Sequence, residues 1–336
     1  MPVAYLTTKN MKAQILGERL EIALPPDAEG VFPDRRWIPL RDIEHVVVDS
    51  GVHLSMRSLC GLLSREIPVL LLSNRTFPHG VAMPFNRAVT VLADQIDRCR
   101  DATFRQKIAS NLIQAKTLNQ RRVLQRLASN RKQPPIAAQW LKSMSIQAAA
   151  AGSLDSLRGL EGAATGRYFE TLALYFPSSM PFERRTRRPP RNEANSLLSF
   201  LYTLATHELV LHLRAIGLEP GWGFFHEAED GRPALALDLL EPYRAPLVDA
   251  LVLDMLNHNR FSADDFERDD NGGVFLKRLS RRKVYAAWED RMEREFQHAQ
   301  TGHRTCMRQH FKDTAASIKK ACIQNDADIY QPFLMN

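Results

Sequence analysis

The sequence predicts an α+β protein in which a small β-rich N-terminal domain precedes a larger all-α C-terminal domain. About 85 residues at the start contain short apolar runs of strand length, and Pro84-Phe85-Asn86 then interrupts the pattern. After about Val91, apolar residues recur at helical spacing. A chain of 336 residues is long enough for two domains. We therefore expect a β-rich domain over 1–85 and a helical domain over 86–336.

Strand-like segments follow one another through the N-terminal domain. Val3–Thr8 is β-prone, and the apolar residues of 20–24 occupy alternate positions. Two further apolar runs, 43–48 and 68–72, have strand length. Apolar residues between Met56 and Leu63 fall at helical spacing. These patterns predict a small sheet with one helix.

The helical part begins with a clear four-residue recurrence of Phe104, Ile108 and Leu112. The same kind of spacing predicts four more helices along the rest of the chain, over 148–174, 195–215, 245–257 and 280–299.

Basic side chains are concentrated in the helical part. The whole chain has a formal net charge of +7 and a pI near 9.3. Residues 1–90 contain ten basic and nine acidic side chains, whereas 91–132 contains ten basic and three acidic ones. Two further basic clusters are Arg184, Arg185, Arg187, Arg188 and Arg191, and Lys277, Arg278, Arg281, Arg282 and Lys283. A solvated surface and a nucleic-acid-binding surface are the two interpretations.

The sequence favours a soluble, cytoplasmic protein without a membrane segment. Its four cysteines are far apart and form no C-x-x-C pair, which is not the pattern of a secreted disulfide scaffold. The N-terminus lacks the apolar core of a signal peptide. Polar residues interrupt the longest apolar stretch, 197–213, which is therefore unsuited to span a bilayer.

Glu161 is the first candidate for chemistry. Small residues at 162–164 follow it and would allow a neighbouring backbone to approach, so Glu161 is expected on a buried surface. A buried carboxylate needs a partner. An ion pair with an arginine is the simpler interpretation of this segment alone.

His226, Asp238 and Glu241 are the other candidates. His226 ends the tight segment 221–226, which contains two glycines and three aromatic residues. An apolar run then leads to Asp238 and Glu241, which share a face if the run is helical there. The alternative is that these acidic side chains stabilise the N-terminus of a helix. This would explain one of the two carboxylates more easily than both.

Carboxylates combined with one imidazole suit Mg²⁺ or Mn²⁺. A zinc site is the competing possibility at His303, Cys306 and His310, which have helical spacing but lack the fourth ligand of a structural zinc site.

Four sequence boxes now point to a known family. They are L-E-G-A-A-x-x-x-Y-F, R-R-P-P-R-N-E-A-N-S-L-L-S-F-L-Y-T, G-F-F-H and A-L-D-L-L-E-P-Y-R-A-P-L-V-D, in this order along 160–249. Together they resemble the CRISPR adaptation integrase family Cas1. The β-rich start, ending in 67–72, is also similar to the N-terminal domain of that family.

This resemblance implies a metal-dependent DNA endonuclease and integrase that inserts new spacers into a CRISPR array. It assigns Glu161, His226 and Glu241 as catalytic metal ligands for Mg²⁺ or Mn²⁺. Asp238 would be an additional ligand or would orient one. Arg184, Arg188 and Arg244 are candidates for contacts to DNA phosphates.

The resemblance also implies partners. They are protospacer and repeat DNA, a second copy of the chain in a homodimer joined through the N-terminal sheets, and the small protein Cas2. The β-rich domain would then be an assembly surface.

Two other functions remain open from the residues alone. One is a DNA-binding architectural protein without catalysis, which the basic clusters would equally support. The other is a metal-dependent hydrolase of small phosphodiesters.

Overall fold

The chain divides into two units, which a computed structural model describes over residues 3–26, 30, 33, 35–72, 78–84, 88–297 and 302–335. One unit comprises residues 1–86 with 278–289, and the other comprises 87–277 with 290–336. The expected boundary after residue 85 lies outside the described residues. The segment 278–289, which the sequence pattern placed in the helical domain, belongs to the first unit.

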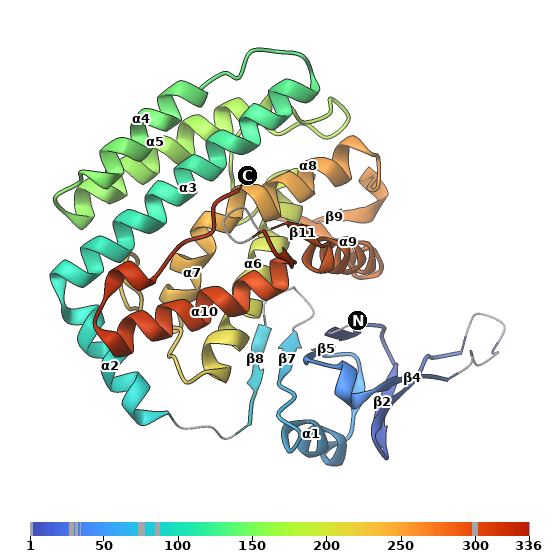
Figure 1. Ribbon diagram of the computed structural model, residues 1–336. Coiled ribbons are helices and arrows are strands. Elements are labelled where there is room, and N and C mark those ends of the chain that lie inside the picture. Colours follow the sequence, from blue (N-terminus) through green and yellow to red (C-terminus); the bar gives the residue numbers. More distant parts are fainter. Residues whose placement is uncertain are drawn as a thin grey trace. The chain divides into compact units, whose positions relative to one another are not determined.

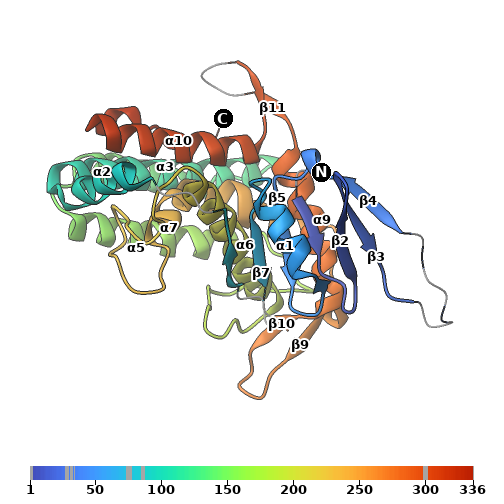
Figure 2. The same ribbon diagram turned by 90° about the horizontal axis from the view of Figure 1, so that it is seen from below.

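Two four-stranded sheets form the first unit (Figures 1 and 2). In one sheet, of order β1-β5-β7-β8, the strand β5 pairs in parallel with β1 and β7, and β8 is antiparallel to β7. In the other, of order β4-β3-β2-β6, β3 is antiparallel to both of its neighbours and β6 is parallel to β2. The strands are β1 (Val3–Leu6), β2 (Lys12–Leu16), β3 (Arg19–Ala23), β4 (Arg36–Pro39), β5 (His45–Asp49), β6 (His53–Leu54), β7 (Val69–Leu72) and β8 (Pro78–Ala82).

The strands predicted from apolar runs are confirmed. β5 is buried along its whole length, which explains its continuous apolar sequence. β3 has two buried positions that alternate with more exposed ones, as its period of two predicts. The sequence pattern did not reveal β2, β4 or β6. In β2 the exposed Lys12 alternates with the small Ala13, and this is a weak signal.

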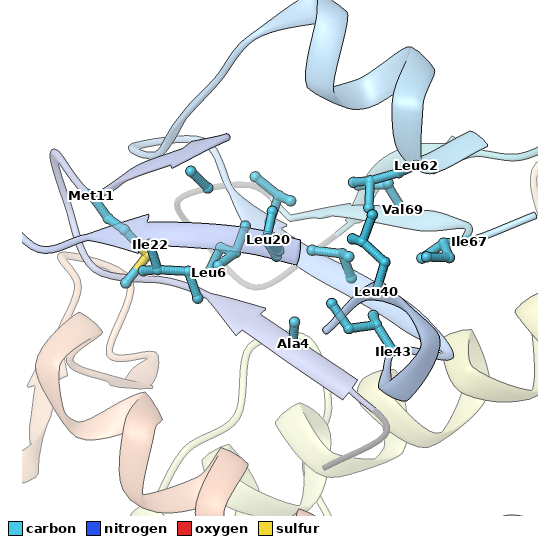
Figure 3. Close-up of a cluster of buried hydrophobic side chains, with 13 residues drawn as sticks. Ala4, Leu6, Met11, Leu20, Ile22, Leu40, Ile43, Leu62, Ile67 and Val69 are labelled. Carbon is cyan, nitrogen blue, oxygen red and sulfur yellow. The ribbon is translucent and has the colours of Figure 1, made fainter. Parts of the chain in front are cut away.

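The core of the first unit lies between its sheets and the helix α1 (Met56–Leu63). Ser55 begins this helix, because its hydroxyl accepts a hydrogen bond from the main-chain N–H of Ser58 at 3.1 Å. Leu62 of α1 points toward Val69 of β7, and both are fully buried (Figure 3). Burial of one such leucine or valine contributes about 1.5–3 kcal/mol of hydrophobic free energy.

A buried carboxylate at the end of β5 holds the segment 278–289 in the first unit. The side chain of Asp49 forms an ion pair with Arg278 and lies 3.8 Å from Arg281. Tyr5 of β1 stacks on Tyr285 with 4.6 Å between the ring centroids. These two arginines of the third basic cluster therefore have structural partners.

The second unit is mainly helical, as predicted. The long helix α3 runs alongside α4 and α5 (Figure 1), and α10 contacts α2. Asp101 caps α3, because its carboxylate accepts from the main-chain N–H groups of Thr103 and Phe104. The helices are α2 (Val89–Arg100), α3 (Ala102–Asn130), α4 (Ala138–Ala149), α5 (Leu154–Ala173), α6 (Glu193–Ala215), α7 (Ala234–Leu240), α8 (Ala250–Asn257) and α10 (Met307–Gln324), while α9 (Arg281–Glu293) begins in the first unit and ends in the second.

The second unit also carries β structure, so "all-α" describes it incompletely. Within the described residues, β9 (Phe266–Arg268) pairs antiparallel with β10 (Val274–Leu276), and β11 (Phe296–Gln297) pairs antiparallel with β12 (Arg304–Thr305). Strands of two or three residues are too short to show a period in sequence. Over the residues that the structure describes, no helix is long and apolar enough to cross a membrane.

Candidate metal and active site

Glu161 lies on α5 and is only partly buried, with 24% of its side chain exposed. Its Oε1 accepts a hydrogen bond from the hydroxyl of Thr165, one turn further along, at 2.9 Å. The same oxygen forms an ion pair with Lys116 of α3. The partner of this carboxylate is therefore a lysine, where the sequence suggested an arginine.

The small residues after Glu161 do not have the role that we expected. Gly162 and Ala163 are exposed, and a Cβ at Gly162 would contact nothing within 4 Å. The expectation that they allow a neighbouring backbone to approach was wrong for these two residues, which leave the helix surface beside Glu161 open. Ala164 is buried.

Glu241 is the most deeply buried of the three residues predicted to be catalytic ligands. It begins the short 3-10 turn 241–243 after α7, so the run is helical at Asp238 and Glu241, as the sequence argument required. Its Oε1 is 3.0 Å from Nε of Arg244 and its Oε2 is 2.7 Å from Nζ of Lys116. Burial raises the pKa of this carboxyl, but the charges of Arg244 and Lys116 outweigh it and lower the pKa to about 2. Glu241 is thus ionised at neutral pH.

His226 is oriented by Asp238, which is fully buried. Oδ1 of Asp238 lies 2.6 Å from Nδ1 of the imidazole and also accepts from the main-chain N–H of His226 at 2.9 Å. Oδ2 accepts from the main-chain N–H groups of Phe224 and Phe225, at 2.6 and 2.9 Å. This network assigns the imidazole proton to Nδ1 and leaves Nε2 as the lone-pair nitrogen.

Gly223 is required for this arrangement. A Cβ at this position would lie 2.8 Å from Oδ2 of Asp238 and 2.9 Å from the carbonyl oxygen of His226. Any larger residue would therefore push apart the loop and the carboxylate that it surrounds. Close packing therefore explains why the G-F-F-H box begins with a glycine.

Lys116 was missed by the sequence reasoning, although a signal was present. It lies four residues after Leu112 and so continues the recurrence of Phe104, Ile108 and Leu112 along the buried face of α3. Only 4% of Lys116 is exposed. A lysine at a position that the pattern reserves for an apolar residue needs charged partners, and Glu161 and Glu241 are those partners.

Another side chain links two of the predicted ligands. Lys116 forms ion pairs with both Glu161 and Glu241, and His226 has an electrostatic influence on Glu241. Within the described residues, no three His, Cys, Asp or Glu side chains are arranged to hold a metal ion as they stand. The donor set itself, two carboxylates and one imidazole, fits Mg²⁺ or Mn²⁺.

Tyr202 lies between two arginines next to this site. The guanidinium of Arg244 lies 4.8 Å from the ring centroid of Tyr202, and that of Arg185 lies 5.5 Å from it. The hydroxyl of Tyr202 donates a hydrogen bond to Asp249. Burial raises the pKa of Asp249 to about 6, against the lowering effects of the Tyr202 and Tyr168 hydroxyls and the two arginines.

The predicted DNA-binding arginines differ in position. Arg184 and Arg188 are exposed, as a phosphate contact requires, whereas Arg244 is largely buried and bonds Glu241. Tyr168, the tyrosine of the first sequence box, is fully buried.

The competing zinc triad is not assembled. His310 is buried and its ring stacks on Phe296, with 5.4 Å between centroids and 4° between planes. His303 is exposed and precedes the helix α10 that was expected to carry all three residues.

Two carboxylates and an oriented imidazole, positioned here by a two-part α+β fold, form the kind of site that metal-dependent nucleases use. The family model "CRISPR associated protein Cas1" matches residues 4–290. "CRISPR-associated endonuclease Cas1 1" of Thermodesulfovibrio yellowstonii is 31% identical over 304 residues, which cover 88% of this chain and 92% of that protein. "CRISPR-associated endonuclease Cas1 2" of Rhodospirillum rubrum is 34% identical over 308 residues, covering 88% and 87%. The chain belongs to the Cas1 family of CRISPR-associated endonucleases.

Solved structures share the fold. A "Casposase bound to integration product" matches with a TM-score of 0.86 at 19% identity, over 100% of this chain and 96% of that one. A chain of a "Cas6-RT-Cas1--Cas2 complex" matches with a TM-score of 0.80 at 25% identity. This second match covers 99% of the present chain but only 36% of the longer one.

Proposed function

We propose that this protein is a Mg²⁺- or Mn²⁺-dependent DNA endonuclease and integrase of CRISPR adaptation. It would catalyse attack of protospacer 3′-hydroxyl ends on a phosphodiester of the repeat array. The observation that carries the proposal is the convergence of Glu161 and Glu241 on one cationic centre beside His226, in a chain of the Cas1 family.

A divalent ion held by Glu161, Glu241 and Nε2 of His226 would neutralise charge on the phosphoryl oxygens and lower the pKa of the attacking hydroxyl. Asp238 keeps the imidazole in the required tautomer, because its Oδ1 accepts a hydrogen bond from Nδ1–H. The carboxylate of Asp238 accepts its hydrogen bonds from the loop 224–226, so it acts as a positioning residue.

The surrounding basic residues have two roles in the proposal. Arg244 acts within the site, since its guanidinium forms an ion pair with Glu241 and keeps that carboxylate ionised. Arg184 and Arg188 are exposed and would hold the DNA strand through phosphate contacts. Such contacts fix the position of DNA but carry little sequence information.

We further propose the partners. The first unit, with its near-neutral charge over residues 1–90, would be the surface for a homodimer and for a Cas2-like protein. The similarity to a chain of a Cas6-RT-Cas1--Cas2 complex supports a Cas2-like protein as a partner. The reaction would take place in the cytoplasm.

A strand-transfer assay tests the function. Protospacer DNA and a supercoiled plasmid with a repeat array are incubated with the full-length protein, with a Cas2-like partner, and with Mn²⁺, Mg²⁺ or EDTA. We expect joined product with either metal, none in EDTA, and none when the protospacer ends in a dideoxynucleotide.

Matched variants of one helix identify the site. Glu161→Gln should abolish joining, whereas Glu170→Gln should not, because Glu170 is an exposed residue of the same helix α5 that pairs with Arg167. Salt-sensitive DNA binding without joining by the wild type would instead indicate an architectural protein. Cleavage of a simple phosphodiester without DNA affinity would indicate a small-molecule hydrolase.

A further inference from the structure

The ammonium group of Lys116 lies between the two carboxylates that are proposed to bind metal. It forms ion pairs with Oε1 of Glu161 and, at 2.7 Å, with Oε2 of Glu241. These oxygens belong to different helical segments, since Glu161 lies on α5 and Glu241 follows α7. Lys116 itself comes from α3, so three separate segments meet at one nitrogen atom.

We infer that Lys116 is a placeholder cation, which assembles Glu161 and Glu241 without metal and must leave the space between them when a divalent ion binds. This inference rests on the proposed metal-dependent function. It makes Lys116 a positioning residue that competes with the metal and so sets the affinity of the site.

The burial of Lys116 supports this role. Only 4% of the residue is exposed, and a buried ammonium without a counter-charge is strongly unfavourable. Glu241 is nearly as buried, so without a cation between them the two carboxylates would repel each other in a poorly hydrated space. In the metal-free protein the lysine therefore compensates the negative charge of the two carboxylates. In the metal-bound protein the ion would compensate the same charge.

The charge balance supports displacement as well. Glu161, Asp238 and Glu241 are three carboxylates, and Lys116 and Arg244 supply two positive charges. Arg244 occupies the other oxygen of Glu241, so both oxygens of this carboxylate already have a cation. A metal ion that took Oε2 would come within contact distance of the ammonium if Lys116 stayed, and two like charges that close repel each other.

The ammonium group of Lys116 can move toward solvent on the side of Glu161. Glu161 is the exposed end of the cluster, with 24% of its side chain accessible, and Gly162 and Ala163 beside it leave the surface open. A lysine has four flexible methylene groups and can move its ammonium toward water along this side.

Metal binding to the full-length, EDTA-treated protein tests the inference. Mn²⁺ affinity is measured by calorimetry at one fixed pH for the wild type and for Lys116→Met, which keeps the length of the side chain but removes its charge. We expect the variant to bind Mn²⁺ about tenfold more tightly or better, in the usual range of coupling between two sites. Without metal it should melt at a lower temperature than the wild type, and Mn²⁺ should raise that temperature more.

Lys107→Met is the matched control, because Lys107 is an exposed residue of the same helix that pairs with Asp328 at the surface. Its Mn²⁺ affinity should equal that of the wild type. Lys116→Gln is a second uncharged variant for the case that Lys116→Met does not fold without metal. Folded Lys116→Met or Lys116→Gln that binds Mn²⁺ no more tightly than the wild type would overturn the inference.

Failure of the inference and failure of the proposed function give different results. If joining requires metal and Glu161 but the lysine variants gain no affinity, only the placeholder role is wrong. If neither the wild type nor any lysine variant binds Mn²⁺ or Mg²⁺, both are wrong.

Discussion

Asp238 binds His226 twice, with its Oδ1 lying 2.9 Å from the main-chain nitrogen and 2.6 Å from the imidazole Nδ1. The other carboxylate oxygen accepts from two more main-chain N–H groups of the same loop. A single buried carboxylate therefore determines both the path of the loop and the orientation of the ring.

Asp238→Asn should disrupt this arrangement, because an amide group offers only one acceptor oxygen to four donors. Whichever way the amide is turned, its NH₂ group faces N–H donors that the carboxylate satisfied. We expect a loss of about 3 kcal/mol in the free energy of unfolding, measured in urea. Mn²⁺ affinity should fall by about 10- to 100-fold, as is usual when the partner of a ligating histidine is removed. Asp155→Asn is the control, since 90% of the Asp155 side chain is exposed, and an equal effect there would contradict the assignment.

Gly223→Ala should destabilise the protein by about 1–3 kcal/mol, since the new methyl group would be too close to Oδ2 of Asp238 and to Cβ of Ala234. Gly166→Ala on α5 should have the opposite sign. Its Cβ would contact nothing within 4 Å, and alanine favours a helix over glycine by about 0.5–1 kcal/mol. Thermal and urea unfolding of both variants measures the difference. Equal stability of the two variants would show that Gly223 is not closely packed.

Asp249 should make stability depend on pH in an unusual direction. Burial raises its pKa to about 6, above the ordinary range of an aspartate, so the folded state holds its proton more tightly. The resulting stabilisation is complete below about pH 4 and is lost as the pH rises through about 6. Relative to Asp249→Asn, the wild type should lose about 2 kcal/mol between pH 4.5 and 7.5.

Urea titrations of both proteins at the two pH values give this difference. Asp254→Asn is the control, because 46% of the Asp254 side chain is exposed. A wild type that gained stability over Asp249→Asn with rising pH would contradict a raised pKa at Asp249.

Asp49→Asn should destabilise the first unit by about 3 kcal/mol. The variant leaves the guanidinium groups of Arg278 and Arg281 without the carboxylate that they share, and a broken buried ion pair is costly. Asp42→Asn, at a side chain that is 51% exposed, should have little effect. Urea unfolding followed by circular dichroism measures both, and an Asp49→Asn protein as stable as Asp42→Asn would show that the pair is unimportant.

Much of the fold could be predicted because the buried residues of several elements form recognisable apolar patterns in the local sequence. β5 and α1 are examples, since continuous or periodic apolar residues match their buried faces. The helix α4 gave no such signal. Its exposed face carries Trp140 and Ile146, so apolar residues occur all around it and the period is obscured.

The candidate site was predicted only in part for a different reason. Glu161, His226 and Glu241 stood in sequence boxes that resemble a family, but Lys116 stood among ten basic residues of a surface-like stretch. What distinguishes it is contact with α5 and with the turn after α7, and tertiary contacts of this kind are not encoded in spacing along one helix.

The placement of 278–289 with the first unit has a consequence for dividing the protein. The polypeptide passes from one unit to the other three times, and the last passage falls inside the helix α9. No single cut can therefore release the β-rich part intact. A fragment that stops at residue 86 would keep Asp49 while discarding both of its arginines. Residues 278–289 would have to be joined to that fragment, or added back as a separate peptide, before its assembly with any partner is examined.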